Sequence, residues 1–242
     1  MTSNQFYESD AGATSVEAFA NSPTTNVCKF RISRIVIPYT FYSINSNNNT
    51  FKILEAANTL TITMTPGNYY SQLTFCAMLK TVLEAATLAA ETYTCSANVD
   101  TGLLTISTTA TNIGPQLLSY PKAAKVLGFQ ALNYTAIATS LSGTLPININ
   151  SSYIKVGTNI STAISNRLNG SITRYYCIIP INVSAYGVID YTPYSDYLDI
   201  SGGSALANVR FDLYDQNGDT LGGATGLNGD KFVIALDVVY SK

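Results

Sequence analysis

The chain has 242 residues, of which 46% are hydrophobic and 12% are charged, and its formal net charge is −2. This apolar share supports a substantial core, whereas the charged share is about half the usual one, so Ser, Thr, Asn and Tyr must cover much of the surface. The 13 Lys and Arg residues are scattered and form no basic stripe for nucleic acid, and no apolar run approaches the roughly 20 residues of a membrane-spanning helix.

The first 27 residues are polar and hold few apolar side chains, with Phe6, Tyr7 and Phe19 isolated among them. Such a composition predicts a flexible N-terminal arm over residues 1–27. We expect the arm to order on assembly, with these three aromatic residues as its contacts. The segment has no basic start before an apolar stretch, so it is not a secretory signal.

A strong alternation begins at Cys28 and predicts a strand over residues 28–39. Phe30 and Ile32 mark one phase, whereas Ile35 and Ile37 mark the other. In a regular strand this change of phase would turn Ile35 and Ile37 away from the core. One extra residue restores their inward direction, so the pattern predicts a β-bulge at residues 33–34.

The middle of the chain changes from a strand pattern to a helix pattern and back. Apolar and polar residues alternate over 50–65, which predicts a strand. Over residues 73–86, apolar residues recur at steps of three and four, which predicts a helix with Ser71 as its N-cap. This is the one main helix, and we expect it to cover the sandwich. A hairpin is predicted over residues 92–109, because an Asp-x-Gly turn separates two alternating runs.

The remaining elements complete an all-β pattern. A short helix is predicted at 121–127, closed by Gly128, and a strand at 153–158. Alternation then predicts strands at 175–183, 209–213 and 232–240, with Pro180 confining the first of them to an edge or a bulge. About eight strands predict an eight-stranded single jelly-roll sandwich, in one domain over residues 28–242.

The Tyr- and Asp-rich stretch over residues 185–208 is predicted to be a long exposed interaction loop. Its carboxylates could support glycoside hydrolysis, and its tyrosines could stack on a sugar. Inter-subunit packing or solvation of the loop explains the same residues. The candidate residues are Asp190, Tyr191, Tyr194, Asp196, Tyr197 and Asp199.

Other chemistry finds little support. The chain contains no histidine, which removes Ser-His-Asp and Cys-His catalysis and the commonest metal ligand. The four cysteines, Cys28, Cys76, Cys95 and Cys177, lack zinc spacing and are expected as buried free thiols. Residues 215–219 match the first half of a calcium loop, but a turn centred on Asn217 and Gly218 explains them without an ion. The sequence therefore predicts no enzyme, cofactor or metal site.

Several stretches resemble small jelly-roll proteins of virus shells. They are IPYTFYSI at 37–44, NTF at 49–51, ITMTPGNY at 62–69, YTC at 93–95, LLTI at 103–106, KVLGF at 125–129 and NGDKF at 228–232. In this order they resemble the penton and minor capsid proteins of virophages, polinton-like elements and large nucleo-cytoplasmic DNA viruses.

The resemblance implies a structural capsid protein in the virion, assembled in the host cytoplasm. In the penton case, five copies would close around an icosahedral vertex beside major capsid protein trimers and other minor capsid proteins. A minor capsid (cement) protein is the alternative within the same architecture. A host-attachment or carbohydrate-binding module is the alternative outside it.

Overall fold

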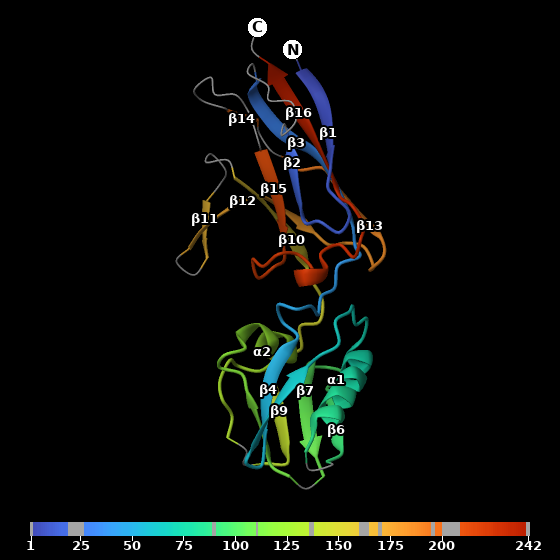
Figure 1. Cartoon of the computed structure of the whole chain (residues 1–242), viewed down its shortest axis with the longest axis vertical. Helices are drawn as coiled ribbons and strands as arrows, with labels where there is room; N and C mark the ends of the chain where they lie inside the picture. Colours follow the sequence, from blue (N-terminus) through green and yellow to red (C-terminus); the bar gives the residue numbers. More distant parts are fainter. Residues whose placement is uncertain are drawn as a thin grey trace. The chain divides into compact units, whose positions relative to one another are not determined.

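The fold is described from a computed structural model, which covers residues 2–18, 27–88, 91–109, 111–135, 138–159, 165–168, 171–194, 197–199 and 209–240 (Figure 1). The chain forms two compact units: unit 1 comprises Met1–Phe41 with Ser151–Lys242, and unit 2 comprises Tyr42–Asn150. Each unit has a separate cluster of buried apolar side chains. The single domain expected over residues 28–242 is therefore corrected to two units, because the chain leaves the first core after Phe41 and returns to it only after unit 2.

Unit 1 contains two antiparallel sheets, which we call sheet A and sheet B. Sheet A has the order β1-β16-β3-β13, and β14 also pairs with β3. Its strands are β1 (Thr2–Glu8), β16 (Val233–Tyr240), β3 (Val27–Pro38), β13 (Val188–Tyr191) and β14 (Leu198–Asp199).

Sheet B has the order β11-β12-β10-β15-β2. Its strands are β11 (Ser165–Leu168), β12 (Ser171–Pro180), β10 (Tyr153–Thr158), β15 (Val209–Tyr214) and β2 (Ser15–Ala18). The inner faces of both sheets contribute to one core, in which the rings of Phe30 and Phe211 lie 6.5 Å apart, edge to face.

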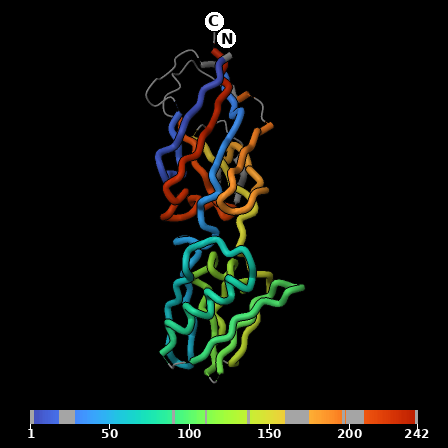
Figure 2. The backbone as a smooth tube through the Cα atoms, turned by 90° about the vertical axis from the view of Figure 1, so that its right-hand side faces the viewer, coloured from blue at the N-terminus to red at the C-terminus, as the bar shows by residue number. Residues whose placement is uncertain are grey.

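Strand pairing in unit 1 is nested. β1 pairs with β16, β2 with β15, β3 with β13, and β10 with β12, all antiparallel. Figure 2 shows the first of these pairs as a blue and a red segment running side by side. This arrangement is consistent with the expected all-β jelly roll.

The bulge predicted at residues 33–34 is confirmed. Ala235 of β16 pairs with Arg34 and Leu236 pairs with Ile32, so Ser33 is the extra residue. Phe30 and Ile32 before the bulge and Ile35 and Ile37 after it are all fully buried. One inserted residue thus keeps both halves of β3 directed into the core.

The expected arm over residues 1–27 is corrected for its described part. Residues 2–8 form β1 and residues 15–18 form β2, and Val16 and Ala18 are buried in the core of unit 1. A polar edge strand needs only backbone pairing and a few inward side chains, so its sequence resembles that of a disordered segment. Residues 1 and 19–26 lie outside the described part.

The stretch expected as a loop at 185–208 also contains strands. Ile189 of β13 is buried opposite Ile37 of β3, and β14 pairs with the other end of β3.

The predicted edge position of Pro180 is confirmed, because β11 pairs only with residues 171–174 of β12 and leaves the second half of β12 with one described partner, β10.

Unit 2 contains two three-stranded sheets and two helices. The sheet orders are β5-β4-β8 and β6-β7-β9. The elements are β4 (Thr50–Glu55), β5 (Asn58–Thr63), α1 (Gln72–Ala86), β6 (Tyr93–Ala97), β7 (Leu103–Thr108), β8 (Ile113–Gln116), α2 (Pro121–Leu127) and β9 (Ser140–Pro146). The 3₁₀ turn η1 (Gly223–Thr225) belongs to unit 1.

Helix α1 begins as predicted, because Ser71 caps it. The Ser71 Oγ accepts from the Thr74 amide, and the Thr74 side chain accepts from the Ser71 amide, which completes a capping box. Phe75, Cys76, Leu79 and Leu83 are buried. Leu73, placed on the apolar stripe by the sequence, is 80% exposed. The helix packs on β6 and β5, so it covers the sheets of unit 2, in place of the single sandwich expected from the sequence.

Helix α2 ends at Gly128, as predicted. Gly128 takes the left-handed conformation with φ of 74°, and a Cβ there would lie 2.1 Å from the carbonyl oxygen of Leu145. Only glycine satisfies both conditions. Neither described helix has the length and apolarity needed to cross a membrane.

Candidate interaction surfaces

The outer face of sheet A combines apolar side chains with ion pairs. Phe6 on β1 is 67% exposed and Val188 on β13 is 55% exposed. Between these edges, Arg31 pairs with Asp237 at 3.0 Å and Arg34 pairs with Asp190 at 2.6 Å. The face therefore neutralises much of its own charge.

The Arg34–Asp190 pair is bidentate, which fixes its orientation. The Arg34 Nε donates to one Asp190 oxygen at 2.8 Å, and Nη2 donates to the other at 2.6 Å. This hydrogen bonding lowers the pKa of the Asp190 carboxyl. Asp190 consequently stays ionised and serves as a salt-bridge partner, which does not suit a general acid.

Five of the six residues predicted for the 185–208 loop are described, and they lie on two strands of sheet A or beside them. Asp190 and Tyr191 lie on β13, Tyr194 is fully exposed, and the Tyr197 ring lies 4.7 Å from the Arg31 guanidinium. Asp199 lies on β14, and Asp196 falls outside the described residues.

The register of β3 separates two of the candidate carboxylates. Asp190 pairs with Val36 and Asp199 pairs with Lys29. Seven residues of extended strand span about 23 Å at roughly 3.3 Å per residue. Glycosidase carboxylates lie about 5–9.5 Å apart, so Asp190 and Asp199 cannot act as such a pair.

The aromatic residues expected on an arm lie on opposite faces of β1. Phe6 faces outward, whereas Tyr7 packs against the core of unit 1 and donates its hydroxyl to the Gln5 side chain. Phe19 falls outside the described residues. Phe6 and Tyr7 therefore cannot contact one partner through the same face.

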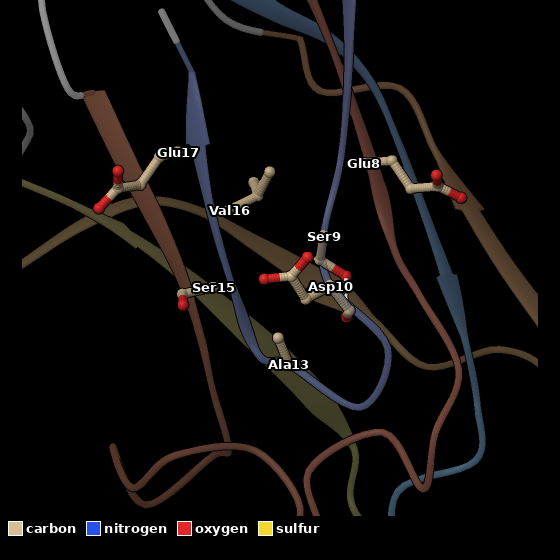
Figure 3. Close-up of a pocket in the computed structure, with 7 residues that line it drawn as sticks. All are labelled: Glu8, Ser9, Asp10, Ala13, Ser15, Val16 and Glu17. Atoms are coloured by element: carbon tan, nitrogen blue, oxygen red, sulfur yellow. Dashed lines mark hydrogen bonds between the residues drawn. The ribbon is translucent and has the colours of Figure 1, made fainter. Parts of the chain in front are cut away.

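A cavity of about 440 Å³ lies at the turn between β1 and β2. Three acidic residues line it, and Figure 3 shows Glu8 on β1 and Glu17 on β2 at its two sides, with Asp10 between them. The other lining residues are Ser9, Ala13, Ser15 and Val16. The acids went unnoticed as a group in the sequence, although residues 1–28 contain three acids and no Lys or Arg.

Hydrogen bonds connect the turn between β1 and β2 to Phe232, the residue before β16. The Ser9 amide donates to the Phe232 carbonyl and the Phe232 amide donates to Ser9 Oγ, both at 3.0 Å. Lys231 lies 3.3 Å from the Glu8 carboxylate. The backbone of the cavity is thus fixed, while Asp10 and Glu17 are exposed to solvent.

The half-matched calcium loop is a turn, as the sequence indicated. Asp215 Oδ1 accepts from the amides of Asn217 and Asp219 at 2.8 and 2.9 Å, and Gly218 has a φ of 88°. Burial raises the pKa of the Asp215 carboxyl. Among the described residues, no group of three metal-ligating side chains lies close enough to hold an ion.

The structure describes the side chains of three of the four cysteines, and all three are free thiols: Cys76, Cys95 and Cys177. Burial raises the pKa of Cys95 and of Cys177 to about 12. A thiol in this state carries almost no thiolate at neutral pH and is a poor nucleophile. The raised pKa values therefore do not favour Cys95 or Cys177 as nucleophiles at neutral pH.

Unit 2 holds a buried carboxylate that the sequence did not single out. Glu55 is 1% exposed, and its oxygens accept from Thr87 Oγ1 at 2.6 Å, the Tyr93 hydroxyl at 2.9 Å and the Leu88 amide at 3.2 Å. These bonds join β4 to the end of α1 and to β6. Glu55 therefore has a structural role, because each of these hydrogen bonds connects β4 to another element of unit 2.

Comparisons with known proteins find a likeness among solved structures and none at the level of sequence. No protein-family model and no curated protein matches the sequence. Among solved structures, the chain is similar to the crystal structure of the SeMet-labeled mavirus penton protein, at 9% identity and a TM-score of 0.49, over 100% of both chains. With a likeness of this size, the functional argument has to come from the strands and side chains described above.

Proposed function

We propose that the chain is a structural protein of a virus shell, built on an eight-stranded jelly roll in unit 1. The observation that carries this proposal is the nested pairing of β1, β2, β3 and β10 with β16, β15, β13 and β12. Two facing four-stranded sheets related in this way make a jelly roll, an architecture of viral capsid, lectin and cupin domains. Strands β11 and β14 are additions to these eight, and unit 2 is an insertion between β3 and β10.

Side-chain chemistry favours assembly over catalysis or metal binding. The chain has no histidine, and the carboxylates on β13 and β14 lie too far apart for glycoside hydrolysis. Only 12% of residues are charged, so a large interface can form with little cost of removing ions from water. The resemblance of residues 37–44 and 62–69 to capsid proteins points the same way.

Within the shell, we propose the penton position, with five copies closing a ring at an icosahedral vertex. The partners would then be other copies of the chain and, around the ring, major capsid protein trimers and minor capsid proteins. A closed ring requires a head-to-tail interface, in which each copy uses two different surfaces. The exposed edges of sheets A and B supply surfaces of this kind.

The test is the mass of the purified protein by native mass spectrometry and sedimentation. A pentamer supports the penton position, and a dimer, a trimer or a monomer at all concentrations contradicts it. A parallel glycan array addresses the attachment module. Saturable binding to one glycan class by a monomeric protein would replace the capsid proposal.

A further inference from the structure

We propose that Tyr186 is an interface residue, which packs against Phe6 of a second copy when the β13 edge of sheet A in one copy meets the β1 edge in the next. This inference rests on the proposed ring and names one contact that would form it. Three observations carry it: the backbone conformation of Tyr186, the exposed aromatic side chains at both edges of sheet A, and the directions of the edge strands.

Tyr186 adopts a backbone conformation that disfavours its own side chain. Its φ is 66°, in the left-handed region, which a bulky residue enters rarely and glycine enters freely. The residue that follows β3 holds this conformation. The Tyr186 amide donates to the Tyr39 carbonyl at 2.8 Å, and the Tyr39 amide donates to the Gly187 carbonyl at 2.9 Å. A glycine at position 186 would make the same backbone bonds without strain, so the strain points to a role for the ring.

The ring of Tyr186 is directed to solvent. The residue is 71% exposed, whereas the preceding Ala185 packs against the core of unit 1. Two residues further on, Val188 of β13 is 55% exposed. A tyrosine offers a large contact area with a polar tip, and such residues often carry much of the binding energy of an interface. Tyr186 and Val188 therefore give the β13 edge an exposed apolar surface.

The opposite edge of sheet A presents a matching aromatic side chain. In the described order β1-β16-β3-β13, β13 lies at one end and β1, which carries Phe6, lies at the other. Phe6 is 67% exposed. A head-to-tail contact joins one surface of a copy to a different surface of the next. Contact between these two edges brings together one exposed aromatic residue from each copy.

The charged residues at both edges are paired within one copy. Glu8 of β1 lies 3.3 Å from Lys231, and Asp190 of β13 lies 2.6 Å from Arg34. A neighbouring copy would therefore meet apolar side chains and carboxylates that already have partners. Because little unpaired charge has to leave water, the edges suit an apolar contact between copies.

The directions of the two edge strands also suit the contact. β1 is antiparallel to β16, β16 is antiparallel to β3, and β3 is antiparallel to β13, so β1 and β13 run in opposite directions. When the sheets of two copies continue in the same sense, β1 meets β13 as an antiparallel pair. An edge strand is a template for pairing with another chain. The contact would then extend sheet A from copy to copy around the ring.

The experiment substitutes each aromatic residue in the full chain and measures self-association by sedimentation. Tyr186→Gly removes the ring and relieves the backbone, so it should unfold at the same or a higher denaturant concentration than the wild type. It should nevertheless associate about tenfold more weakly, or worse. A lower unfolding midpoint would show that the ring stabilises its own copy and would contradict the inference. Tyr186→Phe keeps the ring and should associate like the wild type.

Ala56→Gly is the matched control. Ala56 has a φ of 50° in the turn between β4 and β5 of unit 2, so glycine relieves the same kind of strain there without removing a ring. This variant should associate like the wild type, and an equal loss of association would overturn the role of Tyr186. Tyr186→Asn replaces a glycine variant that circular dichroism shows to be unfolded, because Asn also tolerates the left-handed conformation.

The decisive sample is an equimolar mixture of Tyr186→Gly and Phe6→Ser. Phe6→Ser removes the aromatic residue of the β1 edge and should also associate more weakly than the wild type. In the mixture, the intact β13 edge of one variant can meet the intact β1 edge of the other, which restores one wild-type contact. The mixture should therefore associate more strongly than either variant alone. Equal association of the mixture and the separate variants would show that Tyr186 and Phe6 do not meet.

The outcomes separate this inference from the proposed function. If the wild type and both variants form the same pentamer, the ring is kept and the contact between Tyr186 and Phe6 is wrong. If the wild type is monomeric at all concentrations, the proposed ring fails and the contact fails with it. If a monomeric wild type binds a glycan and Tyr186→Gly does not, the strained residue serves attachment and the inference is overturned.

Discussion

Units 1 and 2 hold their cores together in different ways. In unit 2, hairpins of neighbouring strands, β4 with β5 and β6 with β7, make many of the contacts within one continuous segment. In unit 1, Glu8 pairs with Val233 and Ala18 pairs with Val209, so residues from both ends of the sequence must meet. The difference indicates that unit 2 can fold from its own segment, whereas unit 1 needs strands from both sides of the insertion.

The largest expected effect comes from deleting residues 2–18, which removes β1 and β2. Unit 1 should lose its fold, because both sheets lose an edge strand and the core loses Val16 and Ala18. Residues 42–150 expressed alone should stay folded. Circular dichroism and proton NMR check both fragments, and a deletion protein that keeps two unfolding transitions would contradict the assigned role of β1 and β2.

Core truncations sharpen the comparison further. Phe211→Ala in unit 1 and Phe75→Ala in unit 2 each remove a fully buried ring, and each should cost about 3–5 kcal/mol of unfolding free energy. Each should lower only the transition of its own unit in a denaturant titration. Equal shifts of both transitions would mean that the two units unfold together.

Glu55→Gln tests the buried connection in unit 2. The amide group that replaces one carboxylate oxygen cannot accept a hydrogen bond, so one buried donor loses its partner, at a cost of about 1–3 kcal/mol. Asp100→Asn, at an exposed turn of the same unit, is the control and should change little. Thermal unfolding measures both, and a neutral Glu55→Gln would show that the carboxylate does not join these elements.

Ser71→Ala removes the N-cap of α1. The loss should be about 0.5–2 kcal/mol in the unit 2 transition, and Ser71→Asn should restore most of it because the Asn side chain accepts the same bond. Urea unfolding compares the three proteins. Equal stability of Ser71→Ala and the wild type would remove the capping box from the account of this helix.

Asp190→Asn gives the smallest expected effect and depends on pH. The pKa of Asp190 is lowered in the folded chain, so its pairing with Arg34 stabilises unit 1 above the unfolded value of about 3.9. This contribution is lost as the pH falls through the folded pKa. The variant should unfold slightly earlier than the wild type at pH 7, and the difference should shrink as the pH falls below about 3.9. A difference that does not shrink with falling pH, measured by denaturant titration, would have another cause.

Local features could be predicted from the sequence where the pattern is itself local. The phase change at Ser33, the cap at Ser71 and the helix end at Gly128 each follow from a few adjacent residues, and all three are confirmed. The alternation of Leu60, Ile62 and Met64 is likewise confirmed. The turn at Ala56, which divides residues 50–65 into two strands, lacked Gly or Pro and went unpredicted.

Features that depend on distant partners could not be predicted in this way. β1 is polar, and β16 is its one partner strand among the described residues. β13 directs only two large side chains toward the core, the buried Ile189 and the partly buried Tyr191. The division into two units depends on which apolar residues meet, and periodicity does not contain that information. The three acids of the cavity between β1 and β2 can be counted in the sequence, but their position around one cavity depends on the strand pairing and could not be predicted.

The pairing of β1 with β16 has a consequence for protein synthesis. β1 is translated before every other strand, and β16 is translated after them, so the nascent chain on the ribosome holds an edge strand whose partner does not yet exist. Unit 2 can fold during this interval, while the surfaces that would join two copies remain unformed. Sheet A of unit 1 can therefore be completed only after the residues of β16 have left the ribosome.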